Sequence, residues 1–208
     1  MTVAFDTFLK QYNMTGSEKA DGYSSDAFEG LTQEEKVIVF DMLVEQLPWA
    51  SDWLFRLDPE KALVVAKEIE PGIRAMSGAG WLQREIVRYS GDLVYQQHMI
   101  EDYEQCGDYA KATLIACISD TPTNEETVAF LKHAMLTERD SHIAFRAGWA
   151  LLSALEISTS TEAGKALDDT VRRAAHSENP ADRHAALERI AMYQRSRFRA
   201  KPDATGLE

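Results

Sequence analysis

Apolar residues recur along most of the chain at the three- and four-residue spacing of amphipathic helices. Alternation with a period of two and Asn-Gly or Asp-Gly hairpin signals, which would indicate strands, are essentially missing. The pattern predicts an all-α protein of about ten helices, most of them about 10–18 residues long and joined by short turns. Two helices, within 31–47 and 141–155, are apolar on most sides, so we expect both to be buried.

Capping residues mark several of the helix starts. Thr32, followed by Glu35, and Thr123, followed by Glu126, match the capping box, in which two side chains satisfy the first backbone N–H groups of a helix. Asp58 is the expected cap of another helix, which starts with a proline and should end at the Pro-Gly pair that follows.

Helices with similar openings recur along the chain. Asp108, Asp140 and Asp182, spaced 32 and 42 residues apart, are each expected to cap a helix rich in small and large apolar residues, and the helix after Asp58 opens in a similar way. Irregular periods of about thirty to forty residues suit solenoids of paired helices. The set resembles the HEAT-like repeat class, over residues 58–195 at most. The resemblance implies a short stack of about five antiparallel helical hairpins with a concave binding face. An irregular helical bundle is the alternative.

The whole chain, residues 1–208, is expected to form a single all-helical domain. Residues 13–30 are rich in Gly, Ser and Asp and should form a long loop that is either functional or mobile. Residues 183–201 carry six bases and one acid, which suits a last helix with basic residues near its C-terminus. Residues 202–208 should form a frayed tail.

The net charge of −12 is concentrated in the first half of the chain. Residues 1–104 contain 19 acidic and 9 basic residues, whereas residues 105–208 contain 15 and 13. Such a field repels nucleic acid and anionic lipid and speeds encounter with basic proteins. We therefore expect a basic protein partner rather than a nucleic acid or a membrane.

The cysteines and the first residues bear on the compartment. Cys106 and Cys117 fit neither a disulfide framework nor a zinc pattern and are typical of reduced thiols. The chain start lacks the basic residues and the apolar core of a secretion signal, and no apolar run approaches the about 20 residues of a membrane span. These features predict a cytoplasmic protein.

One group of side chains could carry chemistry. His98, Glu101 and Asp102 stand at i, i+3 and i+4 and so share a helix face. Their order is the reverse of the Glu-x-x-His motif of helical dimetal sites, and the motif has no second copy. Phosphate-loop and nucleophile-elbow motifs are missing as well. The sequence predicts no metal, cofactor or catalytic residue, and a binding protein rather than an enzyme.

Two segments supply candidate contact residues. Trp49 and Trp53 are four apart, and with Asp52 they would form an interface anchor if exposed, core packing being the other interpretation. The second segment, IEDYEQCGDYA at residues 100–110, joins carboxylates and tyrosines that suit a partner rich in Arg and Lys, unless it is only a solvated helix end. The predicted contacts are Trp49, Asp52, Trp53, Tyr95, Glu101, Asp102, Tyr103 and Glu104.

A small, acidic, cytoplasmic and helical protein is similar to many bacterial immunity proteins, which neutralise a cognate toxin by plugging its active site. This resemblance implies an inhibitor of a basic toxin directed at nucleic acids or nucleotides, bound through an acidic surface. One alternative is a HEAT-like scaffold or adaptor for a peptide or protein. Another is a HEAT-like nucleic-acid-binding or DNA-repair protein, for which only residues 183–201 supply a basic surface. The sequence leaves the oligomeric state open.

Overall fold

The computed structural model describes residues 1–15, 22–74 and 76–200, with side chains up to residue 197. All regular secondary structure in these ranges is helical, which confirms the all-α prediction. The helices form two compact units, Met1–Met99 and Ile100–Glu208. That the chain behaves as one domain stays a prediction.

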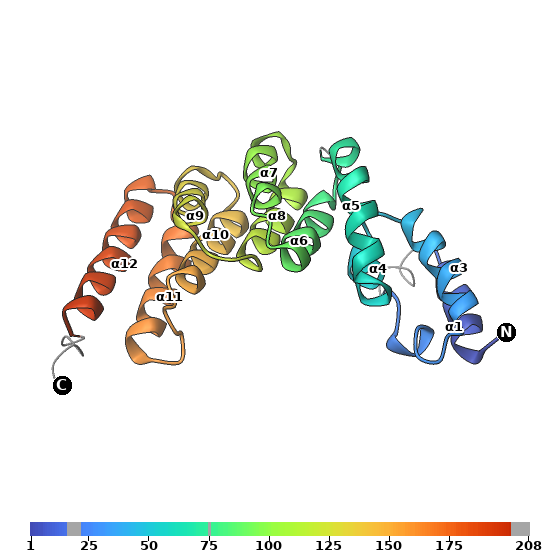
Figure 1. Ribbon diagram of the computed structural model, residues 1–208. Coiled ribbons are helices and arrows are strands. Elements are labelled where there is room, and N and C mark those ends of the chain that lie inside the picture. Colours follow the sequence, from blue (N-terminus) through green and yellow to red (C-terminus); the bar gives the residue numbers. More distant parts are fainter. Residues whose placement is uncertain (16–21, 75, 201–208) are drawn as a thin grey trace, which may run out of the picture. The chain divides into compact units, whose positions relative to one another are not determined.

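The first unit is built around the short helix α4 (Figure 1). This helix packs against α3, α5 and α6, while α1 packs against α3 and the 3-10 helix η1. The bounds are α1 Val3–Tyr12, η1 Ser25–Ala27, α3 Gln33–Val44, α4 Ser51–Leu57, α5 Pro59–Ile73, α6 Ala79–Ser90 and α7 Val94–Asp102, the last of which contains the boundary between the units.

Aromatic rings close the core of this unit. Phe8 on α1 is fully buried and stacks on Tyr23, with ring centroids 5.1 Å apart. Phe28 stacks on Trp53 of α4 at 4.5 Å and meets Tyr23 edge to face at 5.8 Å. Tyr23 and Phe28 belong to the predicted long loop, so the aromatic contacts tie the second part of that loop to the core.

Three predicted segments extend beyond the described residues. Residues 16–21 of the 13–30 loop and the 202–208 tail lie outside the description. The predicted basic helix at 183–201 is described to residue 200, and it is part of the last helix of the second unit.

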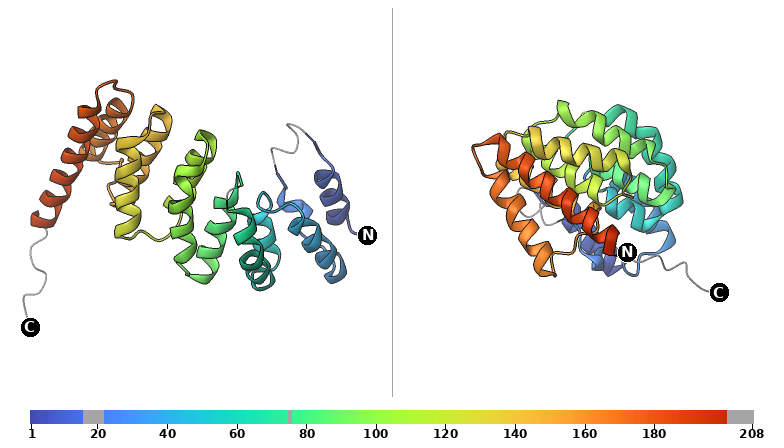
Figure 2. Two further views of the ribbon diagram at one scale, coloured as in Figure 1. Left: turned by 90° about the horizontal axis from the view of Figure 1, so that it is seen from above. Right: turned by 90° about the vertical axis from the view of Figure 1, so that its left-hand side faces the viewer.

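The second unit is built around α10, which packs against α8, α9 and α11. Helix α12 packs against α11 and α9, and Figure 2 shows α11 and α12, in orange and red, running side by side. The bounds are η2 Tyr103–Gln105, α8 Asp108–Ser119, α9 Glu125–Thr137, α10 Ser141–Ala154, α11 Glu162–Ala175 and α12 Pro180–Ala200.

Three of the predicted helix caps are confirmed. The side chains of Thr32, Asp58 and Asp140 each accept a hydrogen bond from a backbone N–H of the first helical turn. Glu35 also accepts from the Thr32 backbone N–H, which completes the predicted capping box. These side chains satisfy donors that would otherwise lack a partner within the helix.

The other predicted caps are wrong. Asp108 is the first residue of α8, because the preceding glycine occupies the N-cap. Asp182 lies within the first turn of α12. The second capping box is built by Asn124 and Thr127 instead of starting at Thr123. For α8 and α9 a neighbouring residue, Gly107 or Asn124, takes the extended conformation that is typical of a cap.

Three further expectations need correction. Helix α3 is not buried on most sides, since Val37 and Ile38 are 49% and 48% exposed. Helix α5 does not stop at the Pro-Gly pair but continues to Ile73, with Pro71 inside its last turn. Helix α10 is buried on one face only: seven of its 14 residues are buried, whereas His142, Arg146, Trp149 and Ser153 are exposed.

Candidate protein-binding site

Two tryptophans form a partly exposed pair on the first unit. Trp49 lies in the turn before α4, and 55% of its surface is exposed. Its ring meets the ring of Trp81 on α6 edge to face, with the centroids 4.9 Å apart and the planes at 70°. Aromatic side chains of this kind offer a large contact area at a low cost in conformational entropy. The pair therefore has the properties of an interface anchor.

A glycine turn brings the two tryptophans together. Gly78, at the N-cap of α6, has a φ of 90°, a backbone conformation that residues other than glycine rarely adopt. A Cβ at this position would lie 3.3 Å from Pro48 Cγ and 3.5 Å from Trp49 Cη2. In the turn that carries Trp49, the buried Ser51 hydroxyl donates a hydrogen bond to the Pro48 carbonyl. Local contacts therefore hold both the turn before α4 and the turn before α6, and they fix the Trp49 ring before a partner binds.

The predicted pairing of Trp49 with Trp53 is wrong. Trp53 stacks on Phe28 in the aromatic core, and the Arg56 guanidinium lies over its ring, 4.8 Å from the centroid. Asp52 forms an ion pair with Arg56 at 2.9 Å and is partly exposed. Trp53 therefore packs in the core, which was one of the two interpretations of the sequence. Of the two tryptophans, only Trp49 remains a candidate contact.

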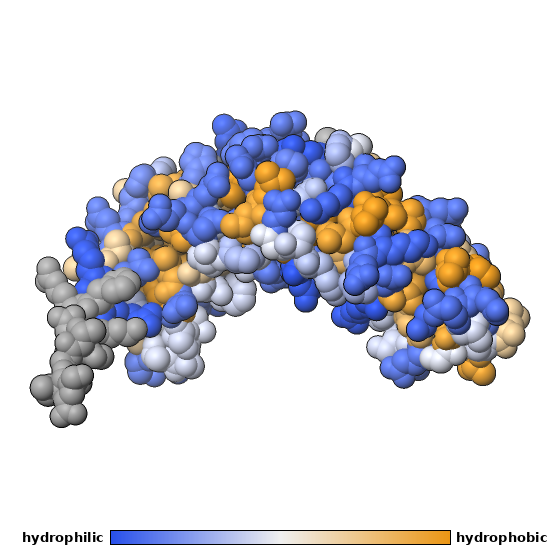
Figure 3. Space-filling view, in the orientation of Figure 1, coloured by the Kyte–Doolittle hydropathy of each residue, from blue (hydrophilic) through white to orange (hydrophobic). Residues whose placement is uncertain are grey.

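The surface of the first unit mixes apolar and acidic residues. Figure 3 shows hydrophobic residues, in orange, over α3 and α5, set among hydrophilic ones. Val37 on α3 and Val64 on α5 are 49% and 68% exposed. Asp41, Glu45 and Glu60 are exposed on the same unit. Apolar side chains next to carboxylates suit a protein partner that carries basic residues around an apolar contact.

A buried polar network ties α5, α6 and α7 together. Glu70 is 1% exposed, and its Oε1 accepts a hydrogen bond from Gln83 Nε2 at 2.8 Å and pairs with His98 Nδ1 at 2.9 Å. His98 therefore pairs with a carboxylate on α5, 28 residues away, a contact that helical spacing could not indicate. Among the described residues, no group of three His, Cys, Asp or Glu side chains is placed to hold a metal ion.

Tyr95 belongs to the edge of this network. Its ring meets the His98 ring edge to face at 5.5 Å, and the Lys67 ammonium lies 5.5 Å from its centroid. Burial raises the pKa of the Tyr95 hydroxyl, and the nearby Glu70 and Asp92 carboxylates raise it further. The phenol therefore stays neutral at ordinary pH, as a half-buried residue that supports the network.

An open pocket in the second unit gathers part of the acidic segment. Lys111, whose side chain is 14% exposed, pairs with Glu138 at 2.8 Å and with Glu104 at 3.7 Å. The hydrogen bond to Glu138 raises the pKa of Lys111, although burial works against this effect. The pocket has a volume of about 600 Å³ and is lined by Glu104, Asp108, Lys111, His133, Thr137, Glu138, Arg139 and Asp140.

Tyr103 is a core residue and not an exposed contact, which corrects the sequence prediction. It is 1% exposed, its ring meets Phe130 edge to face at 4.9 Å, and Lys111 Nζ lies 4.8 Å from its centroid. Burial raises the pKa of the Tyr103 hydroxyl, and Glu138 raises it further, although the hydroxyl makes no hydrogen bond of normal geometry. Tyr103 thus supports Lys111 from inside the unit.

The remaining acidic candidates differ in their positions. Glu101 and Glu104 are exposed, whereas Asp102 is partly buried at the end of α7. Of the four predicted contacts in this segment, Glu104 is the one that lines the pocket. Its side chain is 64% exposed, so its carboxylate is open to a partner.

Trp81, Lys111 and Glu138 were not predicted from the sequence as residues of the site. Trp81 lies 32 residues from Trp49, and Lys111 lies 27 residues from Glu138. Their residue types were consistent with an interface, since tryptophan and paired charges are common there. Their contact partners could not be predicted, because these depend on tertiary packing.

A comparison of this chain with protein-family models, with curated proteins and with solved structures finds no match. Across the described residues, none of the helices is both long enough and apolar enough to cross a membrane.

Proposed function

We propose that this chain is a protein-binding inhibitor, and specifically a cytoplasmic immunity protein that neutralises a basic toxin. The observation that carries the proposal is the exposed Trp49 ring held against Trp81. Interface hot spots are enriched in tryptophan, and a ring fixed before binding loses little freedom in the complex. A partner would bury this ring in an apolar pocket.

The charge of the chain supports a basic partner. The excess of acids lies in the first half, and exposed carboxylates share α3 and α5 of the first unit with exposed apolar side chains. An acidic surface of this kind speeds encounter with a basic protein and disfavours acidic competitors. If the partner's substrate is a nucleic acid or a nucleotide, the carboxylates would imitate the substrate's negative charge in a cationic cleft.

The pocket of the second unit offers a second contact. The ion pair between Glu104 and Lys111 is long, at 3.7 Å, and the Glu104 side chain is largely exposed. An Arg or Lys of a partner can therefore compete for the Glu104 carboxylate. Glu138 is buried and held by Lys111, which keeps the floor of the pocket in place.

The HEAT-like stack of helical hairpins belongs to the same proposal. Helices α9 and α10 pack together across a connection of residues 138–140, and α11 and α12 across residues 176–179. Packed neighbours joined by short turns are the units from which helical solenoids are built. The resemblance therefore finds support in the second unit, where two such pairs follow each other.

Affinity capture from an extract of the source cells tests the proposal. The immobilised full chain should retain a basic protein at low salt and release it as the ionic strength rises, because screening weakens charge attraction. Expressed alone in a bacterial host, that protein should stop growth, and co-expression of this chain should restore growth. Retention of an acidic partner, salt-insensitive retention or a harmless partner would each contradict the proposal.

A further inference from the structure

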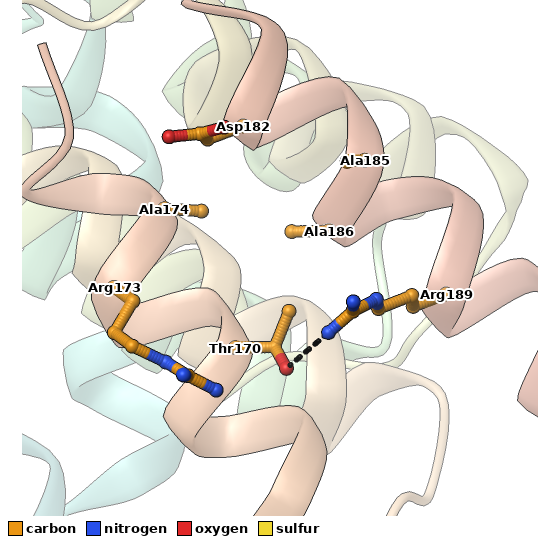
Figure 4. A pocket seen from close by; sticks show the side chains of 7 residues that line it. All are labelled: Thr170, Arg173, Ala174, Asp182, Ala185, Ala186 and Arg189. Carbon is orange, nitrogen blue, oxygen red and sulfur yellow. Dashed lines mark hydrogen bonds between the residues drawn. The ribbon is translucent and has the colours of Figure 1, made fainter. Parts of the chain in front are cut away.

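Two arginines line a small pocket between α11 and α12 in the second unit (Figure 4). The pocket has a volume of about 240 Å³, and three of its lining residues are alanines, of which Ala174 and Ala186 are buried. Figure 4 shows the Arg173 and Arg189 side chains extending toward Thr170 from opposite sides. The lining residues are Thr170, Arg173, Ala174, Asp182, Ala185, Ala186 and Arg189.

Each guanidinium group is held by one hydrogen bond and keeps others to offer. Arg189 donates from Nη1 to Thr170 Oγ1 at 3.4 Å, while Thr170 donates its own proton to the Ala166 carbonyl. Arg173 donates from Nε to the Asp169 carbonyl at 3.2 Å. An arginine has five N–H donors, so most donors on both groups remain available to a ligand.

Within the described part of the chain, neither arginine has an acidic partner. Arg172, next in sequence, pairs with Asp168 at 3.4 Å and lies over the Phe145 ring. In contrast, Arg173 and Arg189 form no ion pair within 4.0 Å among the residues that the structure describes. The chain has 34 acidic and 22 basic residues, so carboxylates are in excess. Two like charges that face one pocket repel each other, and a bound anion would relieve this repulsion.

Asp182 gives the pocket a second, different end. Its carboxylate accepts a hydrogen bond from the Ser177 hydroxyl, and Figure 4 shows it at the opposite end of the pocket from Thr170. The alanines between the two ends leave room for a small apolar segment. The pocket therefore combines anion binding at one end with a hydrogen-bond acceptor at the other.

We propose that this pocket binds the phosphate group of a small phosphomonoester. The Arg173 and Arg189 guanidinium groups hold the phosphate oxygens, since this planar donor fork matches phosphate geometry. Asp182 accepts a hydrogen bond from an amine or hydroxyl of the same ligand. A nucleic-acid backbone fits less well, because the net charge of −12 repels a polyanion. The site does not depend on the protein-binding function proposed above.

Calorimetric titration of the full chain with inorganic phosphate and with O-phosphoserine, against chloride at matched ionic strength, tests the proposal. Both phosphates should bind, because the phosphate group that they share is the part that the two guanidinium groups recognise. Arg173→Gln and Arg189→Gln should each weaken binding about tenfold or more, as expected for the loss of a charged hydrogen-bond donor. Thr170→Val, which only releases Arg189, should have a smaller effect.

Arg195→Gln is the matched control. Arg195 is exposed on α12 and donates from Nε to the Ala191 carbonyl, as Arg173 does to Asp169, but it lies outside the pocket. Its loss should leave phosphate affinity unchanged, and circular dichroism should show that all variants are folded. Equal phosphate affinity in all variants would overturn the proposal. Tight binding of a DNA duplex that Arg195→Gln weakens as much as Arg189→Gln would overturn it in favour of a nucleic-acid surface.

Discussion

Gly148 shows how the packing of α10 depends on one missing methyl group. A Cβ at this position would lie 2.4 Å from Val171 Cγ1 and 3.2 Å from Met135 Sδ, on the two neighbouring helices. Gly148→Ala should therefore lower the free energy of unfolding by about 1–3 kcal/mol, as overpacked cores do. Urea denaturation measures this value. Gly107→Ser is the control, because open space surrounds Gly107 at the N-cap of α8 and serine is favoured there. Equal stability of the two variants would contradict the described packing.

Glu35 makes the stability of the first unit depend on pH. Its carboxylate accepts hydrogen bonds from the Thr2 backbone N–H at 2.7 Å, the Thr2 hydroxyl at 2.8 Å and the Thr32 backbone N–H at 3.0 Å. Burial alone would raise the pKa of Glu35, but these hydrogen bonds outweigh it and lower the pKa below the ordinary value of 4.5. A lowered pKa in the folded state means that Glu35 stabilises the protein above pH 4.5 and loses this effect as the pH falls further.

Glu35→Gln should therefore be less stable than the wild type at neutral pH, and the difference should shrink as the pH falls below 4.5. Urea denaturation at several pH values gives this comparison. Glu34→Gln, on the exposed side of the same helical turn, should show a much smaller change. A difference between wild type and Glu35→Gln that does not change with pH would show that the carboxylate charge has no part in these contacts.

At the level of single elements, the start of α9 separates two residues that the sequence could not tell apart. Asn124 caps the helix by accepting from the Thr127 backbone N–H at 2.8 Å, whereas Thr123 lies one residue outside. Asn124→Ala should cost about 1 kcal/mol of stability, and Thr123→Ala less than about 0.5 kcal/mol. Thermal and urea unfolding of the two variants would decide between the capping box observed and the one predicted. An equal loss of stability in the two variants would contradict the assignment of Asn124 as the single N-cap of α9.

Arg183 gives the basic last helix a structural role. Its largely buried guanidinium donates to the carbonyls of Met135 and Glu138, at the end of α9, and to that of Ala175, at the end of α11. These carbonyls lie at helix ends, where the backbone N–H groups that would pair with them inside a helix are missing. Arg183→Met should lower the free energy of unfolding by about 2–4 kcal/mol, because buried acceptors are left unsatisfied.

Arg195→Met is the control for this change, since Arg195 is exposed on the same helix and should tolerate substitution to within about 0.5 kcal/mol. If both variants unfold at the same urea concentration, the contacts of Arg183 do not stabilise the unit. If Arg183→Met alone is destabilised, at least one of the bases in 183–201 serves folding rather than ligand binding.

Helix existence could be predicted from the sequence, and helix starts only in part. Thr32, Asp58 and Asp140 were identified because a cap needs a short polar side chain in front of an apolar repeat. At Asp108 and Asp182 the same residue type lies inside the helix, where an acid is also favoured by the helix dipole. Sequence spacing alone does not separate these two positions, because both place an aspartate in front of apolar residues.

At the scale of the whole molecule, the candidate site was predictable in composition but not in pairing. The sequence singled out Trp49 and the acidic segment, since exposed aromatic residues and carboxylates suit an interface with a basic protein. It paired Trp49 with Trp53 by helical spacing, whereas the structure pairs it with Trp81. Trp49 precedes α4 instead of lying on it, so helical spacing does not apply. Tyr103 was misplaced for a related reason, because a 3-10 turn after α7 carries its ring into the core.

The three tryptophans of the first unit and the one of the second allow a matched test of the interface. Trp49 and Trp149 are 55% and 54% exposed, but only Trp49 is packed against another tryptophan. Because the two side chains are equally exposed, replacing either by alanine removes a similar amount of buried surface, so a difference in partner binding between the two variants reports on the site and not on folding.

The most direct measurement is the affinity of the captured partner for the wild type, Trp49→Ala and Trp149→Ala, by surface plasmon resonance, with circular dichroism to confirm folding. The protein-binding proposal predicts that Trp49→Ala weakens binding by about 30-fold or more, the effect expected for a hot-spot residue, while Trp149→Ala stays within about threefold of the wild type. Wild-type affinity of a folded Trp49→Ala variant would contradict it.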